Sequence, residues 1–202
     1  MPYKLAGKFV KNAAEATDRC DSSVAEGTCA RSLKPGEGLA SLAWRWPWST
    51  AMPLRFNHME LSLPRGELRR WRDDIVAFYG EVFGFGHRDI DLFDQTCLAL
   101  HTDPDGGQFL LIVEHERHML SPGFDHLGFL LDSAAEVDAK LEACRAWQAR
   151  DPRVQIKLYD DLELPDTVTH AFYVRYGLPI WIDVQHIAFR PGKQPPRTWR
   201  YG

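Results

Sequence analysis

Two segments of the chain carry a histidine at the same place in a shared pattern. Phe56–Leu63 reads FNHMELSL, and Phe124–Leu131 reads FDHLGFLL. In both segments an aromatic and a small polar residue precede the histidine, and alternating apolar positions follow it. Imidazole nitrogen is a common ligand of divalent metals. Two histidines that a duplicated unit brings face to face therefore predict a metal site on His58 and His126.

The alternation decides which side chains accompany each histidine. Side chains of a strand point in turn to its two faces, so Phe56, His58 and Glu60 share one face of the first segment. Phe124 and His126 share the matching face of the second segment. Glu60, two positions beyond His58, is expected to support the ligands or to contact substrate.

A third strand pattern adds a carboxylate. In residues 179–187, Asp183 shares a face with Trp181 and Gln185, whereas the other face is mainly aliphatic and is expected to pack against helices. Two histidines and one carboxylate suit Fe(II), Mn(II), Ni(II) or Zn(II) and leave positions open for a chelating substrate. The alternative is that both histidines are hydrogen-bonded strand residues of a protein that binds no metal.

Three further residues are weaker candidates for the same site. Glu114, in the strand pattern at 109–116, could be a fourth ligand. His170 and Tyr173 share the strand pattern at 168–176, and because side chains alternate only one of them can face a cavity. Either could act as a general acid or base, although packing of the ring is the more common role of a strand tyrosine.

The composition is that of an ordinary globular protein and narrows the classes of partner. The 202 residues are 45% hydrophobic and 26% charged, with a formal net charge of −4 and a pI near 6.1. This charge argues against nucleic acid as the main partner. No stretch has the length and apolarity of a membrane span, and the first residues lack the apolar core of a secretory signal, so cytoplasmic localisation is expected. The four cysteines form no CxxC pair and are expected to be free thiols.

The elements that position the candidate residues fall into two modules. Each begins with the histidine-bearing strand, continues with a helical pattern and ends with three strand patterns, so the order βαβββ occurs twice. The modules span residues 54–117 and 122–188 of one domain at 52–190. Residues 1–51, rich in Ala, Ser, Gly and Lys, are expected to be an accessory or partly disordered extension, and residues 191–202 a tail.

Both helical patterns have clear ends. The first carries apolar residues at helical spacing between Trp71 and Phe83 and is expected to end at Gly84. The second is expected to begin at Ser133, because Glu136 three residues later completes a capping box.

At this level the sequence resembles the vicinal oxygen chelate superfamily, which includes glyoxalase I, bleomycin-resistance proteins, fosfomycin-modifying enzymes and type I extradiol dioxygenases. The match covers roughly residues 54–188. It is carried by the two strand histidines and by three motifs: Ala77–Phe85 (AFYGEVFGF), Asp103–Gly106 (DPDG) and Ile182–His186 (IDVQH). The resemblance implies an α+β fold in which paired βαβββ modules form a curved mixed sheet around a cavity.

The resemblance also implies where a metal would bind. Many members hold it with a histidine on the first strand of each module and a carboxylate on a last strand. These positions fall on His58, His126 and Asp183. The family usually has glutamate at the third position, and because aspartate is one methylene shorter the metal or the backbone has to shift. A four-ligand, glyoxalase-like shell would use Glu114 as well.

The function that the resemblance implies is a metal-dependent enzyme acting on a small oxygen-chelating substrate. The most specific version of this hypothesis is a dioxygenase, and a glyoxalase-like lyase or isomerase is the enzymatic alternative. The alternative from another class is a metal-free binding protein of the bleomycin-resistance type. Superfamily members often pair modules from two chains across a dimer. The resemblance therefore leaves two arrangements open: a homodimer, or a site formed within one chain by its own two modules. The expected cavity lining comprises Phe56, Glu60, Phe124, Trp181 and Gln185.

Overall fold

The computed structural model describes residues 56–92 and 94–194. All of them belong to the second of two units into which the chain divides, Met1–Met52 and Pro53–Gly202. The expected N-terminal extension at 1–51, with Cys20 and Cys29, lies outside the described residues, as does the expected tail beyond residue 194.

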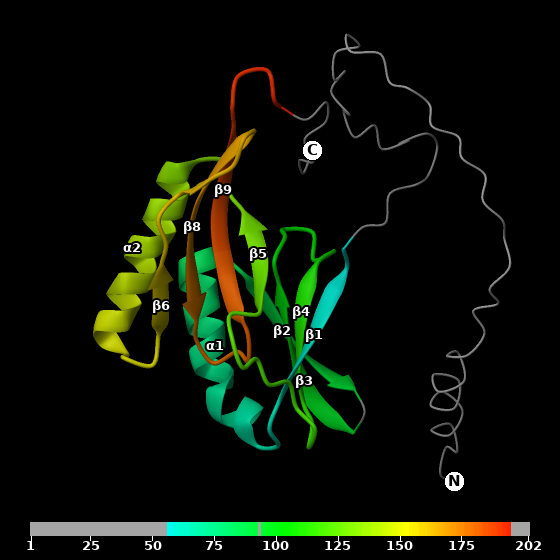
Figure 1. Cartoon of the computed structure of the whole chain (residues 1–202). Helices are drawn as coiled ribbons and strands as arrows, with labels where there is room; N and C mark the ends of the chain where they lie inside the picture. Colours follow the sequence, from blue (N-terminus) through cyan, green and yellow to red (C-terminus); the bar gives the residue numbers. More distant parts are fainter. Residues whose placement is uncertain (1–55, 93, 195–202) are drawn as a thin grey trace, which may run out of the picture. The chain divides into compact units, whose positions relative to one another are not determined.

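The two modules follow each other along the chain and have the same order of elements (Figure 1). The first module contains β1 (His58–Leu63), α1 (Glu67–Phe83), β2 (Gly86–Leu92), β3 (Gln95–His101) and β4 (Phe109–Glu114). The second contains β5 (His126–Leu130), α2 (Ala134–Arg150), β6 (Gln155–Leu158), β7 (Leu162–Glu163), β8 (Thr167–Arg175) and β9 (Trp181–Phe189). The two-residue strand β7 is an addition that the first module lacks.

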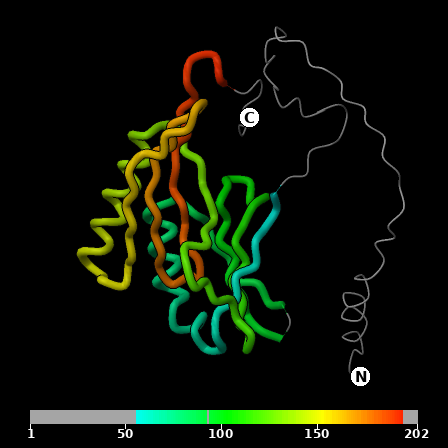
Figure 2. Tube along the Cα trace, in the orientation of Figure 1, coloured from blue at the N-terminus to red at the C-terminus, as the bar shows by residue number. Residues whose placement is uncertain are grey.

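Each module forms its own open sheet. Sheet A has the strand order β1-β4-β3-β2, and sheet B has the order β5-β9-β8-β6 with β7 paired to β8. In both, the first strand runs parallel to the last strand of its module, whereas the remaining pairs are antiparallel. Figure 2 shows this repeated path of the chain. The α+β fold of paired βαβββ modules is therefore confirmed, with the strands divided between two sheets.

The helices follow from their local sequence. The buried positions of α1 recur at the spacing of one helix face and include Ile75, Phe78, Tyr79 and Val82. The helix ends where it was expected to, because Gly84 adopts a φ of 75°, in the left-handed region that favours glycine. At the start of α2, Ser133 and Glu136 form the predicted capping box.

Helix contacts join the two modules into one core. α1 packs on β2, β3 and β4, α2 packs on β6, β8 and β9, and the two helices contact each other. The rings of Phe78 and Trp147 meet edge to face at 5.5 Å. Across the modules, the hydroxyl of the fully buried Tyr79 donates to the carbonyl oxygen of Tyr176 at 3.1 Å. The helices thus cover one face of each sheet, and we call the opposite face the far face.

Cys144 belongs to this core, whereas Cys97 belongs to a smaller cluster with Leu111 and Val113 on sheet A. Cys97 and Cys144 are buried, free thiols. Among the described residues, no helix has the length and apolarity needed to span a membrane.

Candidate functional site

The far face of sheet B brings together two of the three expected metal ligands. β5 and β9 are parallel neighbours, with Gly128 opposite Asp183 and His126 opposite Trp181. The Nε2 atom of His126 lies 3.7 Å from Oδ2 of Asp183. Two ligand atoms bound to one ion at about 2.1 Å each lie roughly 3.0–3.5 Å apart, so a small movement would suffice for joint ligation.

The hydrogen bonds of His126 fix which nitrogen is available. Its Nδ1 atom lies 2.8 Å from the carbonyl oxygen of Phe124. A carbonyl only accepts, so Nδ1 carries a proton and donates, and Nε2 is the nitrogen that lies near Asp183 and that can bind a metal when the ring is neutral. A ligating histidine usually has this arrangement, with its other ring nitrogen bonded to a carbonyl.

Asp183 is the one buried charged residue in the described core, with 6% of its surface exposed. Burial raises the pKa of its carboxyl, and the nearby His126 partly opposes that shift. Its Oδ1 atom is buried and has no hydrogen-bond partner among the described residues. A buried carboxylate oxygen without a donor is costly to the fold, and a cation at this position would offset the cost.

Gly128 makes room beside the carboxylate. A Cβ at this position would lie 3.0 Å from Nε2 of Gln185 and 3.7 Å from Oδ2 of Asp183. A side chain longer than a methyl group would therefore press into the space between β5 and the two polar groups of β9.

The structure separates the two candidate acid–base residues. Tyr173 lies opposite Asp183 on the far face, and its hydroxyl is 3.5 Å from Nε2 of His126. Burial and the Asp183 charge raise the pKa of Tyr173, so its hydroxyl stays protonated and can donate. His170 lies on the helix face instead, where its ring nitrogens contact Asp161 at 2.7 Å and Asp138 at 3.0 Å. Only one of the two candidates was expected to face the cavity, and Tyr173 is the one that lies on this face.

The third expected ligand lies on the other sheet. His58 is exposed on β1, its ring is stacked on Phe109 at 5.0 Å, and its Nδ1 is 2.7 Å from Oδ1 of Asn57. Within residues 56–92 and 94–194, no three His, Cys, Asp or Glu side chains come close enough to hold one metal ion. The expected convergence of His58, His126 and Asp183 within a single chain is not observed, because β1 pairs with β4 while β5 pairs with β9.

Glu114 is not placed as a ligand either. Its Oε1 accepts from the backbone N–H of Leu68 at 2.7 Å, so it caps the first turn of α1. This position is on the helix face of sheet A, opposite to the face that carries His58. Glu60 does share the far face with His58, and it contributes, after burial, to the raised pKa of Cys97.

A cavity of ≈ 360 Å³ adjoins the carboxylate of Asp183. Its lining consists of Tyr159, Asp160, Asp161, Leu162, Thr169, Ala171, Tyr173, Asp183 and Gln185. Of the expected cavity residues, Gln185 lies here, and Phe124 and Trp181 contact each other beside His126 with ring centres 5.7 Å apart. Phe56 and Glu60 belong to the first module, so the expected lining is divided between the two modules.

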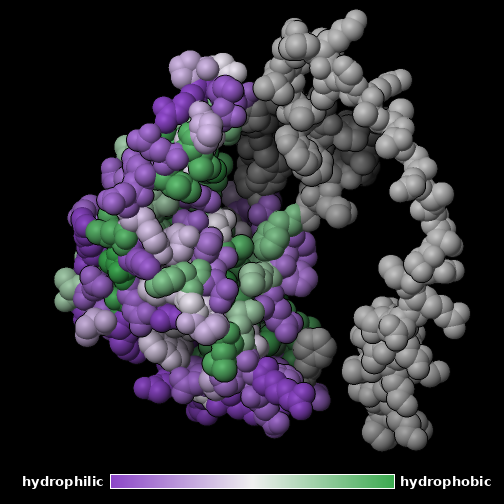
Figure 3. Space-filling model, in the orientation of Figure 1, coloured by the Kyte–Doolittle hydropathy of each residue, from purple (hydrophilic) through white to green (hydrophobic). Residues whose placement is uncertain are grey.

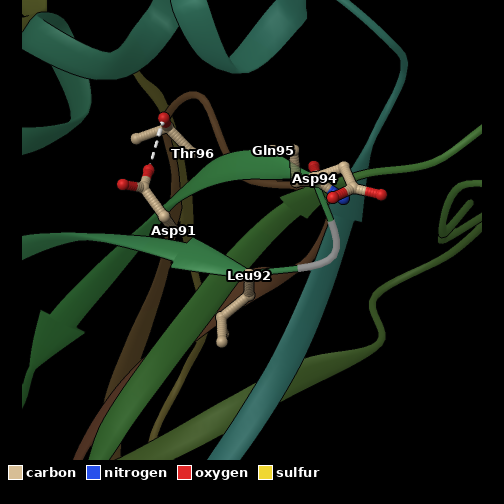
Figure 4. A pocket seen from close by; sticks show the side chains of 5 residues that line it. All are labelled: Asp91, Leu92, Asp94, Gln95 and Thr96. Carbon is tan, nitrogen blue, oxygen red and sulfur yellow. Dashed lines mark hydrogen bonds between the residues drawn. The ribbon is translucent and has the colours of Figure 1, made fainter.

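A separate pocket lies at the turn between β2 and β3 (Figure 4). It is lined by Asp91, Leu92, Asp94, Gln95 and Thr96, and Oγ1 of Thr96 donates to Oδ1 of Asp91 at 2.8 Å. None of the candidate ligands lines it, so we place the site on sheet B.

We call His126 and Asp183 together the half-site, and three residues near it were not anticipated: Lys157, Tyr159 and Arg175. Alternation in the pattern at 154–159 would have put Lys157 and Tyr159 on one face. The pairing of that strand with β8 was the missing information, because only this pairing places Lys157 opposite Tyr173.

The fold and the half-site define a class, that of α+β proteins of paired βαβββ modules with a histidine and a carboxylate on the far face of the second sheet. No protein-family model matches the chain, and no curated protein matches it. Solved structures do match, at low sequence identity.

Three of these structures illustrate the similarity. The fosfomycin resistance protein FosX from Listeria monocytogenes is 15% identical with a TM-score of 0.48, over 66% of this chain and 91% of that chain. Lactoylglutathione lyase from Agrobacterium tumefaciens is 20% identical with a TM-score of 0.43, over 67% and 95%. A glyoxylase/bleomycin resistance protein/dioxygenase domain from Frankia sp. EAN1pec is 19% identical with a TM-score of 0.44, over 70% and 96%.

Proposed function

We propose that this protein is a divalent-metal-dependent enzyme that acts on a small substrate through two chelating oxygens, as a dioxygenase or a lyase. His126 and Asp183 of one chain would hold the ion together with a histidine at position 58. The donor set suits Mn(II), Fe(II), Ni(II) or Zn(II). Oxygenation of a catechol-like diol is the preferred form, and a lyase or isomerase reaction is the enzymatic alternative.

One observation carries the proposal. The available Nε2 of His126 faces a buried carboxylate with an oxygen that has no donor among the described residues. Simple core packing does not account for such a pair, because an apolar residue at position 183 would avoid the cost of burying a charge. A cation between the two groups would account for both the tautomer and the burial.

The surrounding residues would divide the remaining tasks. A bound divalent ion would supply Lewis-acid polarisation of the substrate oxygens. The protonated hydroxyl of Tyr173 would donate to a substrate oxygen beside His126. Tyr159, whose ring centre is 4.8 Å from that of Tyr173, and Gln185 would contact the rest of the substrate. The cavity volume is in the range of sites for small molecules.

The remaining ligand would come from His58 of a second copy of the chain. β1 and β5 are end strands of their sheets and each has a single strand partner. Such strands present free backbone donors and acceptors that another chain can cover. Leu120, before β5, and Leu130, within it, expose 77% and 66% of their surface. The same contact with a second chain would remove this apolar surface from water. On the face drawn in Figure 3, apolar residues lie scattered among a mainly hydrophilic surface of the described residues. A twofold dimer would then hold two equivalent sites.

Calorimetric titration of Mn(II) into full-length, chelator-treated protein tests the proposal. We expect saturable binding by the wild type and a loss of at least about 100-fold in affinity for His126→Ala and for His58→Ala, because two protein ligands hold a labile ion poorly. Tyr173→Phe is the matched control: it should keep metal binding and lose turnover.

Mixing the two inactive variants tests the shared site. A dimer of one His58→Ala chain and one His126→Ala chain has one site with all three ligands and one with neither histidine. Random exchange of equal amounts should therefore restore about one quarter of the wild-type sites. A His58→Ala protein that binds Mn(II) like the wild type would remove His58 from the site, and a wild type that takes up none of the four ions would refute the metal proposal.

The second candidate function is a metal-free binding protein for an aromatic ligand. It is favoured by the rings of Phe124, Tyr173 and Trp181, which line the same face as His126. It predicts ligand binding that survives chelator treatment and that His126→Ala weakens only slightly.

A further inference from the structure

Two basic side chains lie on the same face as the half-site. β6, β8 and β9 are adjacent strands (Figure 1). Their register sets Lys157 opposite Tyr173 and Tyr173 opposite Asp183. Arg175 lies two residues beyond Tyr173 on β8, so it shares this face. Lys157 and Arg175 are diagonal neighbours, whose Cα atoms are about 7–8 Å apart in such a ladder.

Aromatic rings beside His126 hold both cations. The ammonium of Lys157 lies 3.2 Å from the ring centre of Phe124 and 4.9 Å from that of Tyr159. The guanidinium of Arg175 lies 4.7 Å from the ring centre of Trp181, the residue paired with His126. Phe124, which contacts the Lys157 ammonium, also contacts Trp181, which contacts the Arg175 guanidinium. The two positive charges therefore lie close together on one side of the half-site.

These charges are not neutralised within the described part of the chain. Arg175 donates from Nε and Nη2 to Oε1 of Gln155, a neutral acceptor, at 3.1 and 2.7 Å. Among the described residues, neither Lys157 nor Arg175 forms an ion pair, and the ammonium of Lys157 has no hydrogen-bond acceptor. Other basic residues of the same module are paired, as Arg153 is with Asp151 at 2.6 Å and Lys193 with Asp166 at 2.9 Å.

Two like charges at neighbouring positions repel each other, and aromatic contacts only partly offset that repulsion. An oxyanion between them would remove it. It would use the donors of Lys157 and the unused Nη1 of Arg175, which form strong, charge-assisted hydrogen bonds with carboxylate or phosphate oxygens.

We propose that Lys157 and Arg175 form an oxyanion subsite beside the half-site, so that the substrate is an anionic molecule that carries a carboxylate or phosphate-type group in addition to its chelating oxygens. This proposal rests on the proposed function for the position of the chelating oxygens. The oxyanion subsite itself is inferred only from Lys157, Arg175 and the aromatic rings that contact them.

Titration of inorganic phosphate into metal-free, full-length protein isolates the subsite from the metal. We expect saturable binding that Lys157→Met and Arg175→Met each weaken by roughly tenfold, since one charge-assisted contact is lost in each case. Methionine keeps the apolar stem over the ring and removes only the charge. Lys193→Met, which removes a surface lysine that is already paired, should bind phosphate like the wild type. Lys157→Arg keeps the positive charge and should keep most of the affinity for phosphate. It replaces Lys157→Met as the test variant if the methionine variant fails to fold.

Mn(II) titrations of the same proteins separate the two proposals. Lys157→Met should bind Mn(II) like the wild type, and His126→Ala should bind phosphate like the wild type while losing Mn(II). If the wild type binds phosphate but no metal, the proposed function fails and the subsite stands. If the wild type shows no saturable phosphate binding, or both methionine variants bind phosphate as tightly as the wild type, the subsite is refuted.

Discussion

At the scale of single residues, the buried carboxylate of Asp183 should destabilise the fold and is also the proposed metal ligand. It is buried to 6% exposure on a strand whose neighbouring positions are apolar, and one of its oxygens lacks a partner among the described residues. Positions that break local rules of packing are often functional or strained. The same residue should therefore lower the stability of the metal-free protein and hold the metal.

Replacing Asp183 by asparagine should separate these two effects. Asp183→Asn keeps the shape and removes the buried charge, so we expect the free energy of unfolding of metal-free protein to rise by about 1 kcal/mol. Mn(II) binding should be lost at the same time. Chemical denaturation with and without Mn(II) measures both. Asp160→Asn, an exposed change on the neighbouring loop, should alter neither quantity, and a stability loss in Asp183→Asn would contradict this account.

At the scale of elements, His170 joins three parts of the second module. From β8 it contacts Asp138 of α2 and Asp161 of the segment between β6 and β7. Asp161 and its neighbours Asp160 and Leu162 line the cavity beside Asp183. His170 therefore contacts a wall of the cavity from the opposite face of the sheet, and of the two candidates for proton transfer it is the one that does not face the half-site.

This contact should make stability depend on pH. The hydrogen bond to Asp161, followed by that to Asp138, raises the pKa of His170 above its ordinary value. A raised folded-state pKa gives stabilisation that is complete below the ordinary histidine pKa and is lost as the pH rises through the folded-state value. The melting temperature of the wild type should thus fall between about pH 6 and pH 8.

The variant His170→Asn should show a smaller fall over the same range, because it has no titrating group at this position. His186 pairs with His170 in the β8–β9 ladder and remains in the variant, so the difference between the two proteins reports on His170 alone. His87→Asn, on exposed β2, is the control and should keep the wild-type slope. Equal slopes for wild type and His170→Asn would show that the contact carries no net stabilisation.

At the scale of the whole described domain, the β8–β9 turn of the second module packs on the helix of the first. Gly177 in this turn has a φ of 65°, and a Cβ there would lie 2.6 Å from Cγ1 of Ile75 and 3.1 Å from Cε3 of Trp71. The close approach of turn and helix therefore requires glycine, both for its backbone conformation and for lack of space.

Gly177→Ala should destabilise the protein by roughly 2–5 kcal/mol, the sum of a left-handed alanine and an overpacked contact between the modules. Gly192→Ala is the matched control. Its φ is 75° but no atom lies within 4 Å of the new Cβ, so only the backbone term of about 1–2 kcal/mol should remain. Urea denaturation of both variants measures the difference. Equal losses in the free energy of unfolding would show that the turn can move away from α1 at no additional cost.

The sequence by itself determined the elements and the faces of the strands. Periods of two and of 3.6 residues arise from each segment's own backbone geometry, so β1, β5, β9 and both helices were predictable, together with the Ser133 capping box and the common face of Asp183 and Gln185. The duplicated histidines were visible for the same reason, because each copy is read within eight residues.

Only the tertiary structure decided which of these faces meet. Pairing between distant strands set Gly128 opposite Asp183 and brought Tyr173 to His126, and it left His58 on the other sheet. It also turned Glu114 and His170 towards the helices. Strand register and sheet assignment depend on side chains packing across tens of residues of chain, and a one-residue change of register would exchange the faces. No local pattern records that choice, so the sequence predicted the candidate ligands but not their grouping.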